Sequence, residues 1–318
     1  MPVFTLPEGP ALLSICLMAA RGAGALSLLG ASTALADECP ASAQTEWLAP
    51  AAKANGVTGT VEIEGARISY HDTGGGGEPI IFGHAASGSA ESWAYQQSEF
   101  ASAGYRVITY SRPGHRGSPI LDEAKFENDP VDSLNSLANA LGLNKFHYVG
   151  HAAGGTIGPG YALRHGDRLL SLTLANTTAG IKDEAYAEAS AMLMPPGFRE
   201  MPADYRELSP SFRLSNPEGR REWMRIAETS RESGPLGPPP KKGGVYLSEL
   251  EDISVPVLII AGDADAYLPP ARARQLAARF PNAKTVTIRE AGHSANWEQP
   301  IMFNCLVLEF LQSHPASP

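Results

Sequence analysis

The chain has 318 residues, enough for one large α/β domain or two smaller domains. A hydrophobic content of 43% and a charged content of 19% describe an ordinary globular protein and exclude a disordered one. The net charge of −9 and the lack of any long run of Lys and Arg argue against nucleic acid as a partner. We expect a small-molecule substrate; the oligomeric state is left open.

The first 36 residues have the features of a secretory signal peptide. Arg21 precedes an apolar run of Gly, Ala, Ser and Leu, and residues 34–36 (Ala-Leu-Ala) form a cleavage site of small residues. A membrane anchor is the alternative, and a start at Met18 would give a more regular signal. We expect export to the periplasm or the medium, with no stable membrane insertion of the mature chain.

Three cysteines occur in the chain, and Cys16 would leave with the signal peptide. Cys39 and Cys305 remain; in an exported chain they either form one disulfide or stay as two thiols. Their spacing does not resemble a metal-binding Cys/His cluster, so no metal site is expected.

The secondary structure expected after an N-terminal arm (37–58) alternates between strands and helices. Alternating residues over 60–64 and 67–71, with Gly65 between them, predict an antiparallel hairpin at a sheet edge. The short, wholly apolar run 79–82 predicts a strand buried on both faces of a parallel sheet. Further strands are expected at 105–110, 145–149, 169–175, 255–261 and 285–288. Helices are expected at 93–100, 132–141, from the turn after 152 to 165, and at 270–280 and 301–312.

This order predicts a mostly parallel sheet with right-handed crossovers. The strand pattern is interrupted at residues 178–249, a segment rich in Met and Pro that carries an amphipathic stretch at 220–229. We interpret this segment as a helical cap inserted into an α/β core formed by residues 59–177 and 250–318.

Residues 145–155 form the stretch around which the chemistry is organised. An apolar strand runs into a tight turn in which Gly150 and Gly154 flank Ala152, and a helix is expected to follow. A strained turn from strand to helix requires small residues two positions before and after its central residue. The turn would present the side chain of Ala152, a methyl group without a hydroxyl.

Four motifs in this order resemble the α/β-hydrolase superfamily, over residues 60–313. They are the small-residue loop 83–88, the loop 112–118, the elbow 150–154, and two late loops carrying Asp265 and His293. The resemblance implies an α/β fold with a mostly parallel twisted sheet flanked by helices and a helical cap. Within the superfamily the chain is similar to capped esterases, lactonases and C–C hydrolases.

The resemblance assigns Asp265 to the acid position, because it follows Gly262 by three residues and precedes Pro269 by four. Asp263 is the alternative, although a side-chain hydrogen bond in a turn is its simpler role. His293, in Ala-Gly-His-Ser after the last strand, takes the position of the base. A carboxylate at a strand end would hold its imidazole in one tautomer.

The family pattern also assigns an oxyanion hole to the main-chain N–H groups of Ala86 and Ala153. One residue departs from the pattern, because Ala85 replaces the usual Gly after His84, and its methyl could narrow the site. Residues expected to line the substrate pocket are His84, Ser87, His151, Met192, Met194 and Trp297.

Three interpretations of Ala152 stay open. The sequence is a serine enzyme inactivated by a Ser-to-Ala change, or an enzyme that works without the serine by letting His293 activate a water, or a binding protein without activity. Ser87 and Ser89 are poor substitutes for the nucleophile, because neither lies in an elbow. The intact Asp265 and His293 argue for retained chemistry.

We therefore expect a hydrolase acting on a small, mostly apolar carbonyl compound such as an ester, amide or lactone. The alternative is a non-catalytic protein that binds a ligand in the capped pocket. No Gly-x-Gly-x-x-Gly follows a predicted strand, so no dinucleotide cofactor is expected, and no other cofactor is implied.

Overall fold

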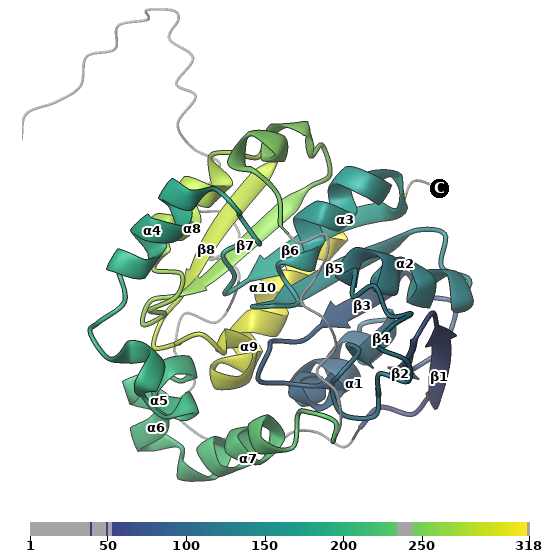
Figure 1. The fold of residues 1–318 in the computed structure, drawn as a ribbon, viewed down its shortest axis with the longest axis horizontal. Coiled ribbons are helices and arrows are strands. Elements are labelled where there is room, and N and C mark those ends of the chain that lie inside the picture. Colours follow the sequence, from purple (N-terminus) through teal and green to yellow (C-terminus); the bar gives the residue numbers. More distant parts are fainter. Residues whose placement is uncertain (1–38, 40–48, 50–52, 234–243, 317–318) are drawn as a thin grey trace, which may run out of the picture. The chain divides into compact units, whose positions relative to one another are not determined.

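The computed structural model describes residues 39, 49, 53–233 and 244–316. The expected signal peptide and most of the expected arm lie outside the described residues. Within the compact unit Ser32–Pro318, eight strands form one sheet in the order β1-β2-β4-β3-β5-β6-β7-β8 (Figure 1).

The strands confirm the sequence-based prediction of an edge hairpin followed by parallel strands. β1 pairs antiparallel with β2, and β2 pairs antiparallel with β4, whereas every later pairing in the sheet is parallel. The strands are β1 (Val57–Ile63), β2 (Ala66–Asp72), β3 (Pro79–Gly83), β4 (Arg106–Ser111), β5 (Phe146–His151), β6 (Leu169–Ala175), β7 (Val257–Gly262) and β8 (Ala283–Ile288). β5 and β7 are buried along their whole length, as expected for strands covered on both faces.

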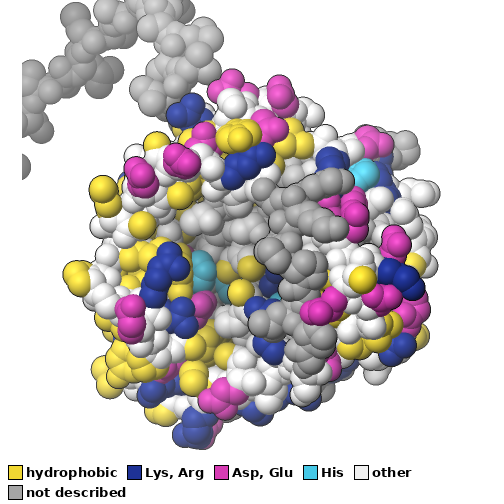
Figure 2. Space-filling model, in the orientation of Figure 1, with side chains coloured by type: hydrophobic (Ala, Val, Ile, Leu, Met, Phe, Trp, Pro, Cys, Tyr) yellow, Lys and Arg dark blue, Asp and Glu magenta, His cyan; other side chains and the backbone are white. Residues whose placement is uncertain are grey.

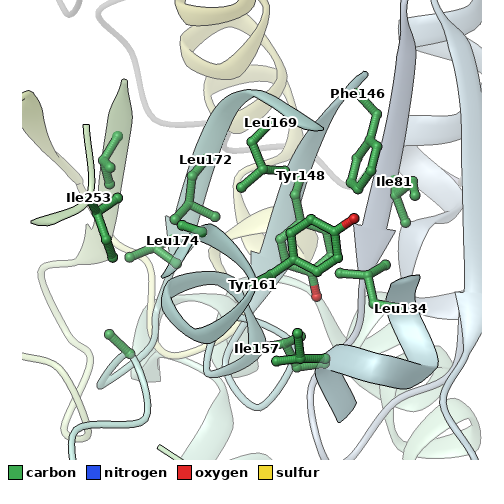
Figure 3. Close-up of a cluster of buried hydrophobic side chains, with 14 of the residues drawn as sticks. Ile81, Leu134, Phe146, Tyr148, Ile157, Tyr161, Leu169, Leu172, Leu174 and Ile253 are labelled. Carbon is green, nitrogen blue, oxygen red and sulfur yellow. The ribbon is translucent and has the colours of Figure 1, made fainter. Parts of the chain in front are cut away.

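Helices cover both faces of the sheet. One face packs against α2 (Pro130–Ala140), α3 (Ile157–His165) and α8 (Pro270–Ala277), and Figure 3 shows Leu134, Ile157 and Tyr161 meeting side chains of the strands. The other face packs against α1 (Ala94–Ser102) and α10 (Pro300–Gln312). The fold is therefore the predicted three-layer α/β arrangement with a mostly parallel sheet.

Between β6 and β7 the chain forms a series of short helices. They are α4 (Glu184–Met192), α5 (Ala203–Glu207), α6 (Pro210–Ser215) and α7 (Pro217–Glu228), with 3₁₀ turns at Phe198–Glu200 and Leu247–Asp252. The side chains of Ser209 and Asn216 cap α6 and α7, and each is followed by a proline at the first helical position. Trp223 and Ile226 form the buried side of α7. We call the segment α4–α7 the cap.

The cap packs on the core through aromatic side chains. Trp223 and Ile226 share a hydrophobic cluster with Tyr95 of α1 and Trp297 of α9 (Ala295–Glu298). The remaining short elements are the 3₁₀ turns Ala90–Trp93 and Gly166–Arg168. Among the described residues, no helix has both the length and the apolar character needed to cross a membrane.

Cys39 and Cys305 form a disulfide, with their Cα atoms 5.9 Å apart. The structure thus decides between the two alternatives that the sequence leaves open. The bond ties a residue of the N-terminal segment to α10 across 266 positions of the chain.

Candidate active site

Five loops meet at the carboxyl edge of the parallel strands, where α/β sheets place their ligand sites. Strands β3, β5, β6, β7 and β8 are parallel neighbours in one sheet, so the loops that follow them lie at one edge. These loops carry the segment 83–88, Ala152, Asn176, Asp265 and His293. Figure 2 shows histidine side chains in the middle of one face of the protein, beside hydrophobic side chains.

Ala152 has the backbone of an elbow residue. Its φ of 47° lies in the left-handed region, which costs a residue with a Cβ about 1–2 kcal/mol. The surroundings hold this conformation, because the Ala152 N–H donates to the Ala175 carbonyl at 2.9 Å. The Ala152 carbonyl in turn accepts from the Thr177 hydroxyl at 2.7 Å. The strained turn is therefore present although position 152 carries only a methyl group.

The two glycines of the elbow are required because neighbouring main-chain atoms leave no room for a Cβ at either position. A Cβ on Gly154 would lie 2.1 Å from the carbonyl oxygen of Gly83 at the end of β3, and one on Gly150 would lie 2.7 Å from the carbonyl oxygen of Gly154. Both distances are too short for any side chain. The prediction that small residues must flank position 152 is confirmed.

The main-chain N–H groups of Ala86 and Ala153 are available for a ligand. Neither donates a main-chain hydrogen bond within the described part of the chain. Ala86 is exposed and Ala153 is half-buried, whereas most of the residues around them are buried. The close approach of Gly154 to Gly83 brings their two loops together. Two free N–H groups in neighbouring loops can hold a developing oxyanion.

Asp265 and His293 form a hydrogen-bonded pair. The Nδ1–H of His293 donates to the two carboxylate oxygens of Asp265 at 3.0 and 2.9 Å. The carboxylate also accepts from the main-chain N–H groups of Tyr267, at 2.8 Å, and Leu268, at 3.1 Å. Asp263, the alternative acid, is exposed instead. The bond fixes the tautomer that leaves Nε2 of His293 for proton transfer.

The charges of this pair stabilise each other. Burial by itself would raise the pKa of Asp265, but the neighbouring His293 and the hydrogen bonds outweigh it, so the pKa lies below its usual range. Burial would likewise lower the pKa of His293. The charge of Asp265 and its hydrogen bond, with smaller contributions from Glu207 and Glu298, raise that pKa to about 9. Asp265 thus favours the charged form of the imidazole.

Asn176 supports this pair and was not found by sequence reasoning. Its amide nitrogen donates to Asp265 Oδ2 and to the carbonyl of Gly292, both at 3.0 Å. Its φ of 48° lies in the left-handed region, where Asn is one of the few tolerated residues. A single Asn after a strand belongs to no motif; only its polar side chain at the end of a buried strand could have drawn attention to it.

The cap contributes contacts to His293 that the sequence did not reveal. The His293 N–H donates to the carbonyl of Glu207 in α5 at 2.9 Å. The ring of Tyr267 lies 4.3 Å from the imidazole, and the Tyr267 hydroxyl accepts from Arg206 at 3.2 Å. Burial raises the pKa of Glu207, and the positive charge of His293 opposes this rise. His293 is thus enclosed by core and cap together.

The place of His84 in the substrate pocket stays a prediction. His84 is fully buried beneath the loop 83–88, where its Nδ1–H donates to the carbonyl of Ala85 at 2.7 Å and its Nε2 accepts from the Arg112 N–H at 2.9 Å. Burial and nearby cations hold its pKa well below the usual value, so the ring is neutral. The family loop 112–118 therefore acts on the site indirectly, by supporting the oxyanion loop.

Three of the expected pocket residues lie together. Ser87, His151 and Trp297 line a cavity of about 10 Å³, enough for one water molecule. The Nε2–H of His151 donates to the carbonyl of His293 at 2.6 Å. Burial, with the charge of His293, lowers the pKa of His151 to about 4, so this ring is neutral.

The two methionines are placed differently. Met192 ends α4 with 84% of its surface exposed, which is inconsistent with a place in an enclosed pocket and corrects that prediction. An exposed side chain at the end of a cap helix is set by how the helix packs, which the sequence did not show. Met194 is half-buried two residues later, and its place in the pocket stays a prediction.

The chain resembles known proteins along most of its length. The family model for the alpha/beta hydrolase family matches residues 80–303. The chain belongs to this family. A 2-hydroxy-6-oxononadienedioate/2-hydroxy-6-oxononatrienedioate hydrolase of Burkholderia vietnamiensis (strain G4 / LMG 22486) is 28% identical, over 77% of this chain and 91% of the relative.

Solved structures agree with the assignment to the α/β hydrolases. A thermophilic esterase from Thermogutta terrifontis superposes with a TM-score of 0.65 at 25% identity, over 79% of this chain and 95% of the esterase. An enol-lactonase from Burkholderia xenovorans LB400 superposes equally well, with a TM-score of 0.65, over 80% of this chain and 100% of the lactonase. At 23% identity the second likeness shows the fold alone.

Proposed function

We propose that this α/β hydrolase cleaves a small, mostly apolar carbonyl compound, an ester, amide or lactone, at the site formed by Asp265, His293 and the N–H groups of Ala86 and Ala153. The observation that carries the proposal is the Asp265–His293 pair, buried and bonded at 2.9–3.0 Å at the sheet edge that also carries the elbow. A carboxylate that orients an imidazole beside two free N–H groups is the machinery of acyl transfer.

With a serine at position 152, the reaction would form an acyl-enzyme. The hydroxyl oxygen attacks the carbonyl carbon while Nε2 of His293 takes its proton, and the oxyanion is held by the N–H groups of Ala86 and Ala153. Collapse breaks the bond to the leaving alcohol or amine, which receives the proton from His293. A water, deprotonated by the same nitrogen, then releases the acid.

With Ala152, as in this chain, a water is the attacking group. His293 takes the proton of the water and returns it to the leaving group, so that the substrate is cleaved without a covalent intermediate. Oxyanion stabilisation and binding without a nucleophile still give about 10³–10⁴-fold acceleration over water. This route requires a neutral imidazole, and the pKa of about 9 makes it slow at neutral pH.

The relatives support carbonyl hydrolysis and leave the substrate open. One is named as a 2-hydroxy-6-oxononadienedioate/2-hydroxy-6-oxononatrienedioate hydrolase, and one structural neighbour is named as an esterase. Esters, lactones and activated ketones share an electrophilic carbonyl carbon that develops an oxyanion. The pair of N–H groups serves each of them in the same way.

The missing hydroxyl at position 152 favours one second candidate, a binding protein without turnover. Such a protein would hold a ligand in the capped pocket. It differs from an impaired enzyme in one outcome: restoring the hydroxyl would leave it inactive.

The test compares the chain with Ala152→Ser and Ala152→Gly on short p-nitrophenyl esters, a lactone and a 2-hydroxy-6-oxo dienoate. The backbone of position 152 suits both replacements. Ser carries a Cβ as Ala does, and Gly tolerates the left-handed φ without strain. We expect a rate at least about 100-fold higher for Ala152→Ser and no gain for Ala152→Gly. His293→Ala added to Ala152→Ser should remove the gain. Turnover by none of the variants on any of these substrates would support the binding protein.

We also propose that the protein is exported after removal of residues 1–36. The disulfide between Cys39 and Cys305 supports this, because such bonds persist in oxidising compartments. N-terminal sequencing of protein purified from the periplasm and the medium should begin near residue 37. Intact chain recovered only from the cytoplasm would contradict the proposal.

A further inference from the structure

Glu298 is a buried carboxyl group close to the proposed base. It lies at the end of α9, five residues after His293, and its side chain is 2% exposed. Buried carboxylates are rare unless they form an ion pair or hydrogen bonds, so Glu298 is expected to have hydrogen-bond donors around it. Neither the elbow nor the Asp265–His293 pair uses it.

The partners of Glu298 are three main-chain N–H groups. Oε1 accepts from Gly292 at 2.9 Å and from Ser294 at 3.2 Å, the residues on either side of His293. Oε2 accepts from Ser209 of the cap at 2.7 Å. One carboxylate thus connects the cap to both neighbours of the base. We call residues 289–294 the histidine loop.

Three further bonds join the cap to the histidine loop. The Ser209 hydroxyl donates to the carbonyl of Glu290 at 2.9 Å, and the His293 N–H donates to the carbonyl of Glu207 at 2.9 Å. The indole N–H of Trp223 donates to the hydroxyl of Ser294 at 3.2 Å. The approach is so close that a Cβ on Gly292 would lie 2.6 Å from the Ser209 nitrogen. The cap is therefore fixed to the loop that carries the base.

We propose that Glu298 is a positioning residue for His293: its carboxylate holds the histidine loop against the cap and adds a further negative charge next to the residues that flank His293. The role of His293 as a base rests on the proposed function, but the contact and its electrostatic effect do not. A displacement of α5 or α6 would move the histidine loop with it. The cap thus sets the alignment of His293 with Asp265, in addition to covering the pocket.

The other charged groups around His293 define what the Glu298 charge adds. Asp265 faces the imidazole from the loop after β7, Glu207 from α5, and the neutral His151 from the end of β5. Arg206 lies next to Glu207 and bonds to Tyr267. Among these groups Asp265 contributes most to the raised pKa of His293, and Glu207 and Glu298 add smaller contributions.

Burial raises the pKa of Glu298 to about 7, while the main chain and side chain of Ser209 and the N–H groups of Gly292 and Ser294 oppose that rise. Protonation near neutral pH would weaken the contact with Ser209 or with the histidine loop, since a protonated carboxyl oxygen is a poor acceptor. The proposed coupling therefore operates fully only above this pH.

The experiment measures the pKa of His293 directly, in the full chain with Ala152, by NMR titration of its ring signals. Assignment comes from His293→Gln. Glu298→Gln keeps the shape and lets the amide oxygen accept from Gly292 and Ser294, but it removes the charge and faces the Ser209 N–H with a second donor. Glu290→Gln is the matched control, because it removes an exposed charge from the same loop.

We expect Glu298→Gln to lower the pKa of His293 by about one pH unit and Glu290→Gln to leave it within about 0.3 unit. Glu298→Asp keeps the charge but shortens the arm, so the pKa should stay high while the Ser209 amide exchanges with solvent at least tenfold faster. An unchanged pKa in a Glu298→Gln protein with native circular dichroism would overturn the proposal. So would equal effects of Glu298→Gln and Glu290→Gln.

A kinetic arm separates the two proposals. In the Ala152→Ser background, kcat is compared at a pH above the pKa of His293 in both proteins, so that the imidazole is neutral in each. There Glu298→Gln should lower kcat at least tenfold with little change in KM, because the base and not the binding pocket is displaced. If Ala152→Ser shows no turnover, the proposed function fails while the titration still decides the role of Glu298. If it turns over and Glu298→Gln leaves kcat unchanged, the positioning role fails and the hydrolase remains.

Discussion

The Nε2–H of His151 donates to the main-chain carbonyl of His293 at 2.6 Å, which joins the residue before the elbow position directly to the proposed base. This bond spans 142 positions of the chain and holds the histidine loop against β5. The ring that makes it is neutral, because burial and the charge of His293 lower its pKa to about 4. The pKa of one histidine in the site is thus lowered and that of the other is raised.

Replacing His151 tests this bond. His151→Phe removes the donor and leaves the buried carbonyl of His293 without it, which should destabilise the fold by about 1–3 kcal/mol. His151→Gln keeps an N–H donor of similar reach and should lose less than half as much. Urea unfolding of the two variants checks the expectation. Equal losses would show that the site responds to ring packing and not to the hydrogen bond.

Gly154→Ala should be among the most damaging small changes in this chain. The new Cβ would meet the Gly83 carbonyl at 2.1 Å and force β3 and the elbow apart, which we expect to cost more than about 3 kcal/mol. Gly166→Ala is the control, since no atom lies within 4 Å of its added Cβ and its φ is −61°. Thermal unfolding should show a large loss for the first variant and no loss, or a small gain, for the second.

Asn176→Gly tests how much the hydrogen bonds from the Asn176 amide contribute to stability. Glycine accepts the left-handed backbone of position 176, so the variant removes only the amide that bonds Asp265 and the carbonyl of Gly292. We expect a loss of about 2 kcal/mol in unfolding free energy, because one of the two bonds goes to a charged group. Glu290→Gly, at a φ of 54° and with an exposed side chain, controls for the backbone. A loss as large in Glu290→Gly would exclude the side-chain explanation.

The stability of the fold should fall as pH rises from 6.5 to 9. The pKa of His293 is about 9 in the folded chain and about 6.5 when unfolded, so the folded state binds this proton more tightly. The contribution is fully present below pH 6.5 and is lost as pH rises through 9, up to about 3 kcal/mol. Urea unfolding at pH 6 and pH 9.5 measures it. His293→Gln should flatten the dependence; an unchanged slope in that variant would assign it to other groups.

Removing the disulfide should destabilise the chain. Cys39 and Cys305 close a long loop, and the loss of a native disulfide costs about 2–5 kcal/mol. We expect Cys39→Ser to lower the Tm by several degrees and to make it insensitive to dithiothreitol, whereas the parent chain loses stability on reduction. If reduction leaves the parent Tm unchanged, the bond does not constrain the folded chain.

The residues that the sequence identified are those whose roles follow from local pattern. Ala152 lies between two glycines in a tight turn, and Asp265 and His293 each lie in a loop that follows a strand. A strand end and a turn are short-range features, so neighbouring residues reveal them. The alternating strands and helices likewise predicted the parallel sheet, because hydrophobic periodicity reflects burial on one or both faces.

The residues that were missed have partners far away in the chain. Asn176 and Asp265 are 89 positions apart, and so are Ser209 and Glu298. No periodicity marks a lone Asn or Glu whose partner is a main-chain group on another element. The contacts of His84 show the same limit, because its motif marked the residue while its bond to the Arg112 N–H, 28 positions away, appears only in the folded chain.

The sequence by itself determined the fold class, the strained turn at Ala152 and the pairing of Asp265 with His293. Strand burial, glycine geometry and motif spacing depend on residues that are close together in the chain. Only the tertiary structure decided that Cys39 and Cys305 pair, that Met192 faces solvent, and that Glu298 joins the cap to the histidine loop. These outcomes depend on which distant segments pack together. Such packing is fixed by the summed contacts of the folded chain, and no single stretch of sequence records it.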